Sequence, residues 1–436
     1  MTLPADLLLF LTVAASFDSP AGEYAESRRG GRPHRLPPGR RASTIPTVAR
    51  NPGRRPFAAR SGASAEKRAS SSSPRLGQPR PGAADSLGDY CPMSLLLDAA
   101  RRRPTPRPPI WLMRQAGRYL PEYRRLRQKT SFLELCKNSA LAAEVMIKTV
   151  ERLGVDAAII FADLLLILEP MGLSLRFDAG EGPVLAPPIA DPTQLDRLRE
   201  LDDLGPLEYV CETVRRTRAG LGDDIPVIGF AGAPFTMAAY AIEGGASRDF
   251  QRAKRWMLQS PDSWDELLGR IARATVRYLN AQIDAGAQVV QLFDSWVGCL
   301  SPADYRRSVL PHSRAVIENL RPGVPVIHFA TGNPALVPLL AEAGGARRNE
   351  LVVGVDWRIV LDEAWRAAGD DVAIQGNLDP AVLLTSPEIV RREAQAVLRA
   401  AGGRPGHIFN LGHGVLPQTP VENVLALIDT VKRHAQ

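Results

Sequence analysis

Five arginines within one short stretch are the residues of this sequence best suited to binding chemistry. Residues 109–127 read PIWLMRQAGRYLPEYRRLR. The arginines are Arg114, Arg118, Arg124, Arg125 and Arg127. Arg114 directly follows the apolar run Ile110–Met113, and guanidinium groups bind carboxylates or phosphates through paired hydrogen bonds. The stretch predicts a site for an acidic ligand; a solvated basic turn is the alternative for one or two of the last three arginines.

Polar or glycine residues also follow each of the other short apolar runs. These positions are Asp163, Gly232, Asp294 with Ser295, Thr331-Gly332-Asn333, Asp356, Asn377 with Asp379, and Gly412-His413-Gly414. In barrel enzymes the active site forms at the carboxyl ends of the strands, so we predict that these residues face one catalytic mouth. Residues of these types also terminate strands for structural reasons, and for Asp356 and Asn377 both interpretations stay open.

The residue types that are missing narrow the chemistry further. None of the six lysines lies at a predicted strand end, which disfavours Schiff-base and pyridoxal chemistry. The four cysteines are far apart without a C-x-x-C pair, and His407 is predicted to lie inside the last strand as a core residue. We therefore predict an enzyme with no metal and no lysine nucleophile, built on a cluster of arginines and one acidic group.

Short apolar runs that alternate with amphipathic helical stretches predict the scaffold. The runs are Ile110–Met113, Ala157–Phe161, Val227–Phe230, Val289–Phe293, Val326–Phe329, Leu351–Val355, Val372–Gln375 and His407–Asn410. Each is short and mostly rich in β-branched residues, as buried parallel strands are. Eight strands alternating with helices over residues 91–436 predict a single (β/α)8 TIM-type barrel. A doubly wound open sheet is the competing fold.

The positive charge of the chain lies in its N-terminal region. Residues 1–90 hold 14 of the 54 Lys and Arg and 7 of the 47 Asp and Glu, so residues 91–436 carry 40 of each. The equal numbers of basic and acidic residues argue against nucleic-acid binding by residues 91–436. The absence of 18 consecutive apolar residues argues against a membrane span. Residues 1–90 are predicted to be disordered, as a functionless extension or misplaced start, a transit peptide, or a binding arm.

Two longer motifs and several short ones resemble the uroporphyrinogen decarboxylase family. Pro109–Arg118 reads P-x-W-x-M-R-Q-A-G-R, and Gly229–Gly245 reads GFAGAPFTMAAYAIEGG. The shorter matches, in the family's order, are Phe161-Ala162-Asp163, Phe293-Asp294-Ser295-Trp296, Gly376-Asn377-Leu378-Asp379-Pro380 and Phe409-Asn410-Leu411-Gly412-His413-Gly414. The resemblance covers residues 91–436 and leaves the N-terminal region unexplained.

The resemblance implies a cofactor-free carboxy-lyase that converts uroporphyrinogen III to coproporphyrinogen III by removing four acetate carboxyl groups. It implies substrate binding by Arg114, Gln115, Ala116, Gly117, Arg118, Arg127, Asp163, Tyr240, Ser295 and His413. Asp163, Arg114 and Tyr240 would be catalytic. Asp163 would accept hydrogen bonds from the pyrrole N–H groups and stabilise the positive charge of a protonated ring; a helix-capping role is its structural alternative. Tyr240 is an aromatic residue on a predicted helix, so the alternative for this residue is that it packs in the hydrophobic core.

The resemblance also implies a homodimer. We expect a cytoplasmic protein, or a plastid one if residues 1–90 are a transit peptide. Two other functions stay open: a corrinoid-dependent zinc methyltransferase and a non-catalytic tetrapyrrole carrier. The methyltransferase is disfavoured because the H-x-C position reads His328-Phe329-Ala330. The proton donor is undecided between Arg114, a water and a substrate carboxyl.

Overall fold

The computed structural model of the chain describes residues 94–178 and 182–435. The predicted disordered extension, residues 1–90, lies outside the described residues.

One curled sheet of seven parallel strands forms the centre of the described chain. Its strands are β1 (Ala158–Ile159), β4 (Val227–Gly232), β5 (Val289–Asp294), β6 (Val326–Ala330), β7 (Leu351–Gly354), β8 (Ala373–Leu378) and β9 (His407–Leu411). They are paired in the order in which they occur along the chain, and every neighbouring pair is parallel. A doubly wound sheet would reverse its strand order near the middle, so this alternative is wrong.

The first predicted strand, Ile110–Met113, forms only an isolated parallel bridge between Ile110 and Phe409 of β9. On the other side, the Ile110 carbonyl accepts the N–H of Asp156 at 2.8 Å, just before β1. Ile110 therefore lies between the first and last strands. The predicted α/β barrel class is confirmed, with seven strands and a bridge where eight strands were expected.

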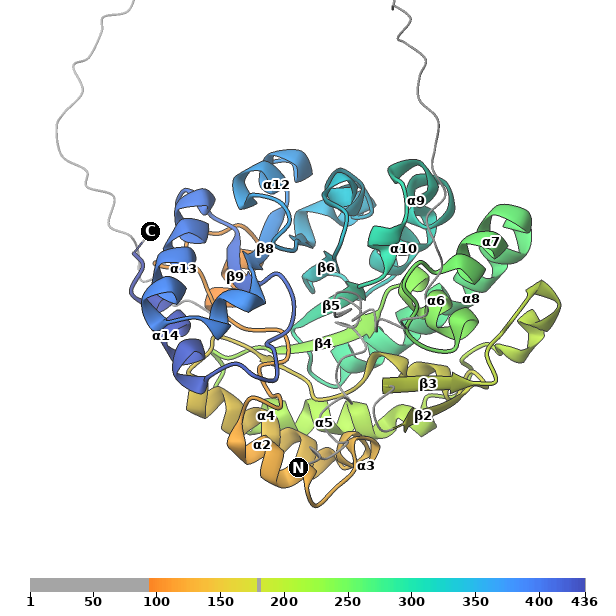
Figure 1. Cartoon of the computed structure of the whole chain (residues 1–436), viewed down its shortest axis with the longest axis horizontal. Coiled ribbons are helices and arrows are strands. Elements are labelled where there is room, and N and C mark those ends of the chain that lie inside the picture. The colour runs from red at the N-terminus through yellow and green to blue at the C-terminus, as the bar shows by residue number, and fades with distance from the viewer. Residues whose placement is uncertain (1–93, 179–181, 436) are drawn as a thin grey trace, which may run out of the picture. The chain divides into compact units, whose positions relative to one another are not determined.

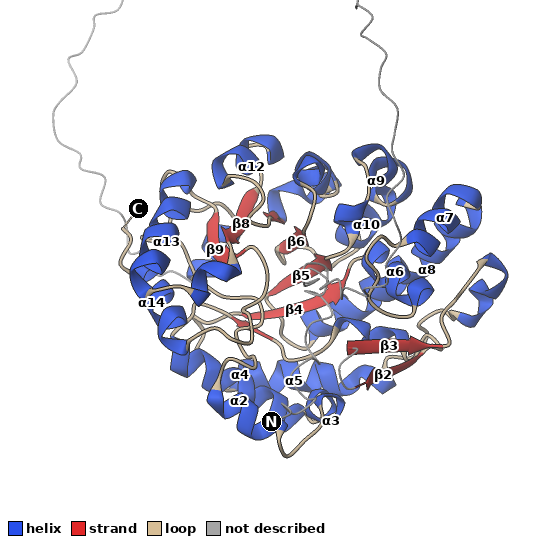
Figure 2. Ribbon diagram, in the orientation of Figure 1, coloured by secondary structure: helices blue, strands red, loops and turns tan. Residues whose placement is uncertain are grey.

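Helices surround the sheet on its outer side (Figure 1, Figure 2). Their bounds are α1 (Leu95–Ala100), α2 (Pro121–Arg127), α3 (Phe132–Lys137), α4 (Ser139–Leu153), α5 (Glu208–Ala219), α6 (Pro234–Glu243), α7 (Gln251–Gln259), α8 (Pro261–Asp284), α9 (Pro302–Ser308), α10 (Leu310–Glu318), α11 (Val337–Glu342), α12 (Leu361–Ala368), α13 (Pro387–Ala401) and α14 (Val421–Lys432). Helix α8 is amphipathic, with Leu268, Ile271 and Leu279 buried in the core.

An antiparallel hairpin that the sequence did not predict lies apart from the barrel sheet. It consists of β2 (Ser174–Asp178) and β3 (Gly182–Ala186). The N–H of Leu185 donates to the carbonyl of Gly244 at 2.8 Å, which ties the hairpin to the end of α6. The helix that carries Tyr240 is therefore supported at its C-terminus by a separate element.

His407 lies inside β9 and is 1% exposed, which confirms its predicted core position. Burial lowers its pKa to about 4, while a 3.0 Å contact of Nε2 with the Gly376 carbonyl opposes that shift. The unfolded chain binds a proton at this residue near pH 6.5, whereas the native chain does so only near pH 4. The native state therefore loses stability relative to the unfolded state as the pH falls from about 6.5 to about 4.

The variant His407→Gln should flatten the acid side of the stability profile, because glutamine keeps an amide donor for the Gly376 carbonyl and does not titrate. We expect the wild type to lose up to about 3 kcal/mol more than the variant between pH 7 and pH 4. The measurement is Tm against pH for both proteins. Parallel profiles would contradict the burial of a neutral imidazole.

Candidate active site

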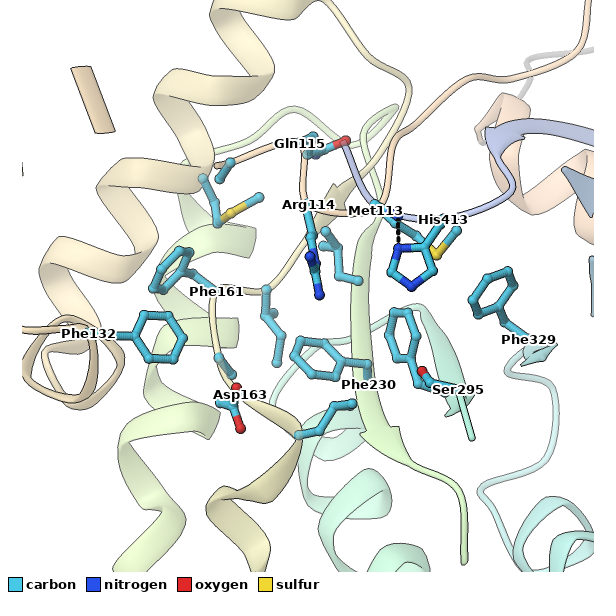
Figure 3. Close-up of a pocket in the computed structure, with 18 residues that line it drawn as sticks. Met113, Arg114, Gln115, Phe132, Phe161, Asp163, Phe230, Ser295, Phe329 and His413 are labelled. Carbon is cyan, nitrogen blue, oxygen red and sulfur yellow. Dashed lines mark hydrogen bonds between the residues drawn. The ribbon is translucent and has the colours of Figure 1, made fainter. Parts of the chain in front are cut away.

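A cavity of about 150 Å³ opens at the carboxyl ends of the strands (Figure 3). Its polar side chains come from four separate segments: Arg114 after the bridge at Ile110, Asp163 after β1, Ser295 after β5 and His413 after β9. The rest of the lining is mostly apolar. The structure therefore brings these four predicted site residues into one cavity, together with the predicted residues Gln115 and Ala116. The low-polarity surroundings strengthen the electrostatic interactions of the charged groups.

Phenylalanine rings form much of the apolar lining, a feature that the sequence analysis missed. They are Phe132, Phe161, Phe230, Phe293 and Phe329. Phe230 packs edge-to-face on Phe293 with ring centroids 5.6 Å apart, and Phe293 packs likewise on Phe329 at 6.0 Å. Four of these rings stand near the carboxyl ends of predicted apolar runs, a periodic placement that is visible in the sequence and could have revealed the lining.

Arg114 extends into the cavity from a loop with an unusual backbone (Figure 3). Its φ of 62° is in the left-handed region, which costs a non-glycine residue about 1 kcal/mol. The loop is held on both sides, because the N–H of Met113 donates to Asn410 Oδ1 at 3.1 Å and its carbonyl accepts the N–H of Val415 at 2.9 Å. Tertiary hydrogen bonds to β9 and its following loop thus maintain a strained conformation that points a guanidinium at the cavity.

Two glycines leave the space that Arg114 occupies. A Cβ on Gly414 would lie 2.4 Å from Arg114 Cδ and 2.7 Å from its Cγ. A Cβ on Gly117 would lie 2.8 Å from the carbonyl oxygen of Arg114. A side chain at Gly414 would collide with the side chain of Arg114, and one at Gly117 with its main-chain carbonyl, so Gly414 leaves room for the side chain and Gly117 for the backbone of the loop.

Asp163 both caps a helix and faces the cavity. It is the N-cap of the 3₁₀ helix Leu164–Leu168, and its carboxylate accepts the N–H of Leu165 at 2.9 Å. Burial raises the pKa of Asp163 to about 6, whereas this hydrogen bond and the positive charge of Arg114 oppose the shift. Asp163 therefore does cap a helix, as the structural alternative predicted. One carboxylate oxygen can accept the capping hydrogen bond while the carboxylate also lines the cavity.

Arg114, Asp163 and Tyr240 interact electrostatically. Burial lowers the pKa of Arg114, and Tyr240 and Asp163 raise it. Burial raises the pKa of Tyr240 above its ordinary value, and the Asp163 charge adds to that shift. Tyr240 is 2% exposed, lies on α6 and packs on Trp296 with ring centroids 5.7 Å apart. The tyrosine is thus behind the lining, where it retains its proton at neutral pH and influences both charged groups.

Ser295 and His413 present hydrogen-bonding groups on the other wall (Figure 3). The Ser295 Oγ is buried and makes no hydrogen bond to the described residues. The Nδ1 of His413 accepts the N–H of Gly414 at 2.7 Å. An imidazole that accepts at Nδ1 carries its proton on Nε2, which makes Nε2 a donor. Both side chains can therefore donate to an anionic ligand.

The remaining predicted residues have mainly structural contacts. Gln115 lines the cavity, but its side chain accepts the N–H of Leu112 at 3.1 Å and donates to the carbonyl of Ala157 at 3.0 Å. Ala116 lines the cavity, and Gly117 supports Arg114 as described. Arg118 and Arg127 are half-buried outside the lining.

Arg118 and Arg127 both act on Tyr123 of α2. Burial raises the pKa of Tyr123, and the charges of Arg127 and Arg118 oppose that shift. Arg127 also lies over the ring of Phe132, 5.9 Å from its centroid. The structure thus places Arg127 over a ring that lines the cavity, although Arg127 itself does not line it.

Asp356 and Asn377, left open above, hold neighbouring loops together. Asp356 accepts the N–H of Gly332 at 2.7 Å and pairs with Arg358, and the Asn377 amide donates to the carbonyl of Asp356 at 2.9 Å. Neither lines the cavity. The structural interpretation accounts for both.

No group of three or more His, Cys, Asp or Glu side chains that could hold a metal ion occurs among the described residues. Within the same residues, no helix is both long and apolar enough to cross a membrane.

Comparisons with known proteins point to one family. The family model described as Uroporphyrinogen decarboxylase (URO-D) matches residues 91–434. Two curated relatives named "Uroporphyrinogen decarboxylase", from Carboxydothermus hydrogenoformans and Sorangium cellulosum, are each 52% identical over 336 residues, which is 77% of this chain and 95% of the relative. A solved methyltransferase from Methanosarcina mazei superposes with a TM-score of 0.66 at 21% identity, covering 78% of this chain and 97% of its own. That likeness shows the fold alone.

Proposed function

This chain belongs to the uroporphyrinogen decarboxylase family, and we propose on that premise that it converts uroporphyrinogen III to coproporphyrinogen III. Each of four acetate side chains would lose carbon dioxide and take up a proton to become a methyl group. No bound cofactor takes part. The observation that carries the proposal is the placement of Arg114 and Asp163 in one mostly apolar cavity.

Arg114, Ser295 and His413 bind carboxylates of the substrate, because each presents N–H or O–H donors in the cavity. A charge-assisted hydrogen bond from each group contributes about 1.5–3 kcal/mol. Arg118 and Arg127 contribute further positive charge from outside the lining, while Gln115, Ala116 and Gly117 shape the Arg114 loop. The phenylalanine rings supply a surface on which the apolar faces of the pyrroles pack.

Asp163 stabilises the charged intermediate. Decarboxylation leaves an electron pair, which a protonated pyrrole ring accepts in place of a cofactor. The carboxylate of Asp163 accepts hydrogen bonds from the pyrrole N–H groups, and this contact strengthens as the ring becomes cationic. Tyr240, behind the lining, orients Asp163. Such a preorganised charge lowers the barrier without changing during the reaction.

The test is anaerobic incubation of the purified protein with uroporphyrinogen III, followed by measurement of coproporphyrinogen III and carbon dioxide. We expect both products to form, and we expect EDTA to leave the rate of the reaction unchanged. Asp163→Asn protein, purified in the same way, is the control for activity carried over from the host. Substrate binding without products would favour the tetrapyrrole carrier, and activity that EDTA abolishes and zinc restores would contradict a metal-free mechanism.

The assembly and location are also proposals. The chain is proposed to act as a homodimer in the cytoplasm. A plastid location would require a transit peptide in residues 1–90, which lie outside the described residues.

A further inference from the structure

The main chain around Ser295 is clamped by two threonine hydroxyls. Thr331 Oγ1 donates to the Ser295 carbonyl at 3.0 Å, and Thr236 Oγ1 accepts the N–H of Trp296, the next residue, at 3.2 Å. Thr331 follows β6 and Thr236 lies on α6, so the two hydroxyls reach the end of β5 from different elements. The position of Ser295 therefore depends on tertiary contacts as well as on its own strand.

A buried carboxylate aligns the second of these hydroxyls. Thr236 Oγ1 donates to Asp294 Oδ1 at 2.9 Å, and both residues are 0% exposed. Asp294 lies between two cavity-lining residues, Phe293 and Ser295, and side chains alternate along a strand, so its carboxylate points away from the cavity. Because the Thr236 O–H donates its hydrogen bond to Asp294, the lone pairs of Thr236 Oγ1 are free to accept the N–H of Trp296.

The cost of burying Asp294 suggests that it has a function. Its second oxygen, Oδ2, lies 3.7 Å from Nε2 of His328, which is also 0% exposed, and makes no hydrogen bond to the described residues. A buried carboxylate with an incompletely satisfied oxygen is expensive in folding free energy, and fold stability alone would favour an apolar residue. Its well-formed hydrogen bond is the one to Thr236.

We propose that Thr236 and Asp294 are positioning residues that hold the Ser295 hydroxyl at its place in the cavity. The proposal rests on the proposed role of Ser295 as a donor to a substrate carboxylate. Thr236 also lies one helical turn before Tyr240, whose ring packs on Trp296. The Thr236 hydroxyl thus also fixes the position of α6 relative to the end of β5.

Single variants give the first test. Thr236→Val keeps the shape of the side chain and removes both hydrogen bonds, so we expect KM for uroporphyrinogen III to rise about tenfold, with a smaller fall in kcat. Thr236→Ser keeps the hydroxyl and should remain within about threefold of wild type. Thr275→Val is the matched control, because Thr275 is 0% exposed on α8 and its hydroxyl makes no hydrogen bond to the described residues.

A double-mutant cycle separates positioning from general support of the fold. Ser295→Ala should raise KM about tenfold, and adding Thr236→Val should change it by less than about threefold more, because the hydroxyl that Thr236 positions is already gone. A full additional tenfold rise, or an equal loss in Thr275→Val, would overturn the proposal. So would unchanged kinetics in Thr236→Val.

One further variant, together with the Ser295→Ala result, keeps the outcome decisive. If Thr236→Val does not fold, Asp294→Ala replaces it in the cycle, since alanine has no acceptor for the Thr236 hydroxyl; we expect KM to rise in Ser295-containing protein only. If Ser295→Ala leaves KM unchanged, the proposed role of Ser295 fails and the clamp fails with it. If Ser295→Ala raises KM while the cycle is additive, only the clamp fails.

Discussion

Asp163→Asn is expected to lower kcat by a factor of at least about 100, because asparagine keeps an acceptor but lacks the charge that stabilises the protonated pyrrole. KM should change less, since the lost interaction is strongest in the transition state. In the wild type, the acid limb of kcat/KM should have a pKa of about 6, where Asp163 takes up a proton. Steady-state kinetics across pH 5 to 8 measure both effects.

The same variant should be at least as stable as the wild type above pH 6. Burial raises the pKa of Asp163 from 3.8 to about 6, so ionised Asp163 destabilises the native state by on the order of 2 kcal/mol. The native wild type gains stability relative to the variant as the pH falls through 6, because it binds a proton that the unfolded chain binds only near 3.8. The stability difference between the two proteins therefore narrows toward pH 4.

Asp191→Asn is the matched control for the capping role. Asp191 also caps a 3₁₀ helix, with its carboxylate 2.9 Å from the N–H of Thr193, but it lies outside the cavity. We expect full activity in this control. A near-normal kcat in Asp163→Asn would remove the electrostatic mechanism, and a large fall in its Tm at pH 8 would indicate that capping dominates.

Arg114→Lys is expected to lower kcat/KM by a factor of about 100. Lysine keeps the positive charge but lacks the planar group that binds a carboxylate through two parallel hydrogen bonds. Misplacing the substrate relative to Asp163 adds a fall in kcat to the rise in KM. Kinetics within about threefold of wild type would mean that charge alone is sufficient at this position.

Gly414→Ala should displace the Arg114 guanidinium while leaving the arginine itself in place. The new Cβ would lie 2.4 Å from Arg114 Cδ, so the side chain must move, and we expect a fall in kcat/KM of about tenfold or more. Gly245→Ala is the control, because its Cβ would meet nothing closer than the Pro183 carbonyl at 3.5 Å. Equal activity of the two alanine variants would contradict the dependence on Arg114 placement.

Local patterns were sufficient to predict much of the scaffold and part of the site. The alternation of short apolar runs with amphipathic helices predicted a parallel α/β barrel, because strands buried on both faces need uninterrupted apolar residues. Arg114, Asp163, Ser295 and His413 were found by their places after those runs. A parallel barrel brings the carboxyl ends of its strands together, so sequence order alone placed these four residues at one mouth.

Local patterns failed where hydrogen-bonding partners come from distant parts of the chain. Ile110–Met113 has the composition of a strand, but the N–H of Met113 bonds to the side chain of Asn410 and that of Leu112 to Gln115, so the ladder stops at Ile110. The left-handed backbone of Arg114 follows from the same contacts. The contact of Leu112 with Gln115 is local, but nothing in residues 109–127 alone specifies the contact with Asn410.

The sequence by itself determined which residue types carry the chemistry and which strand ends they follow, because strand period and chain order are local properties. Only the tertiary structure decided how Arg114 and Asp163 face a wall of phenylalanine rings, and which polar residues, such as Gln115 and Asn377, serve the backbone instead. The physical reason is that a side chain's burial and hydrogen-bonding partners depend on every element packed around it. Those elements meet only when the sheet curls and Ile110 joins β9 to the start of β1.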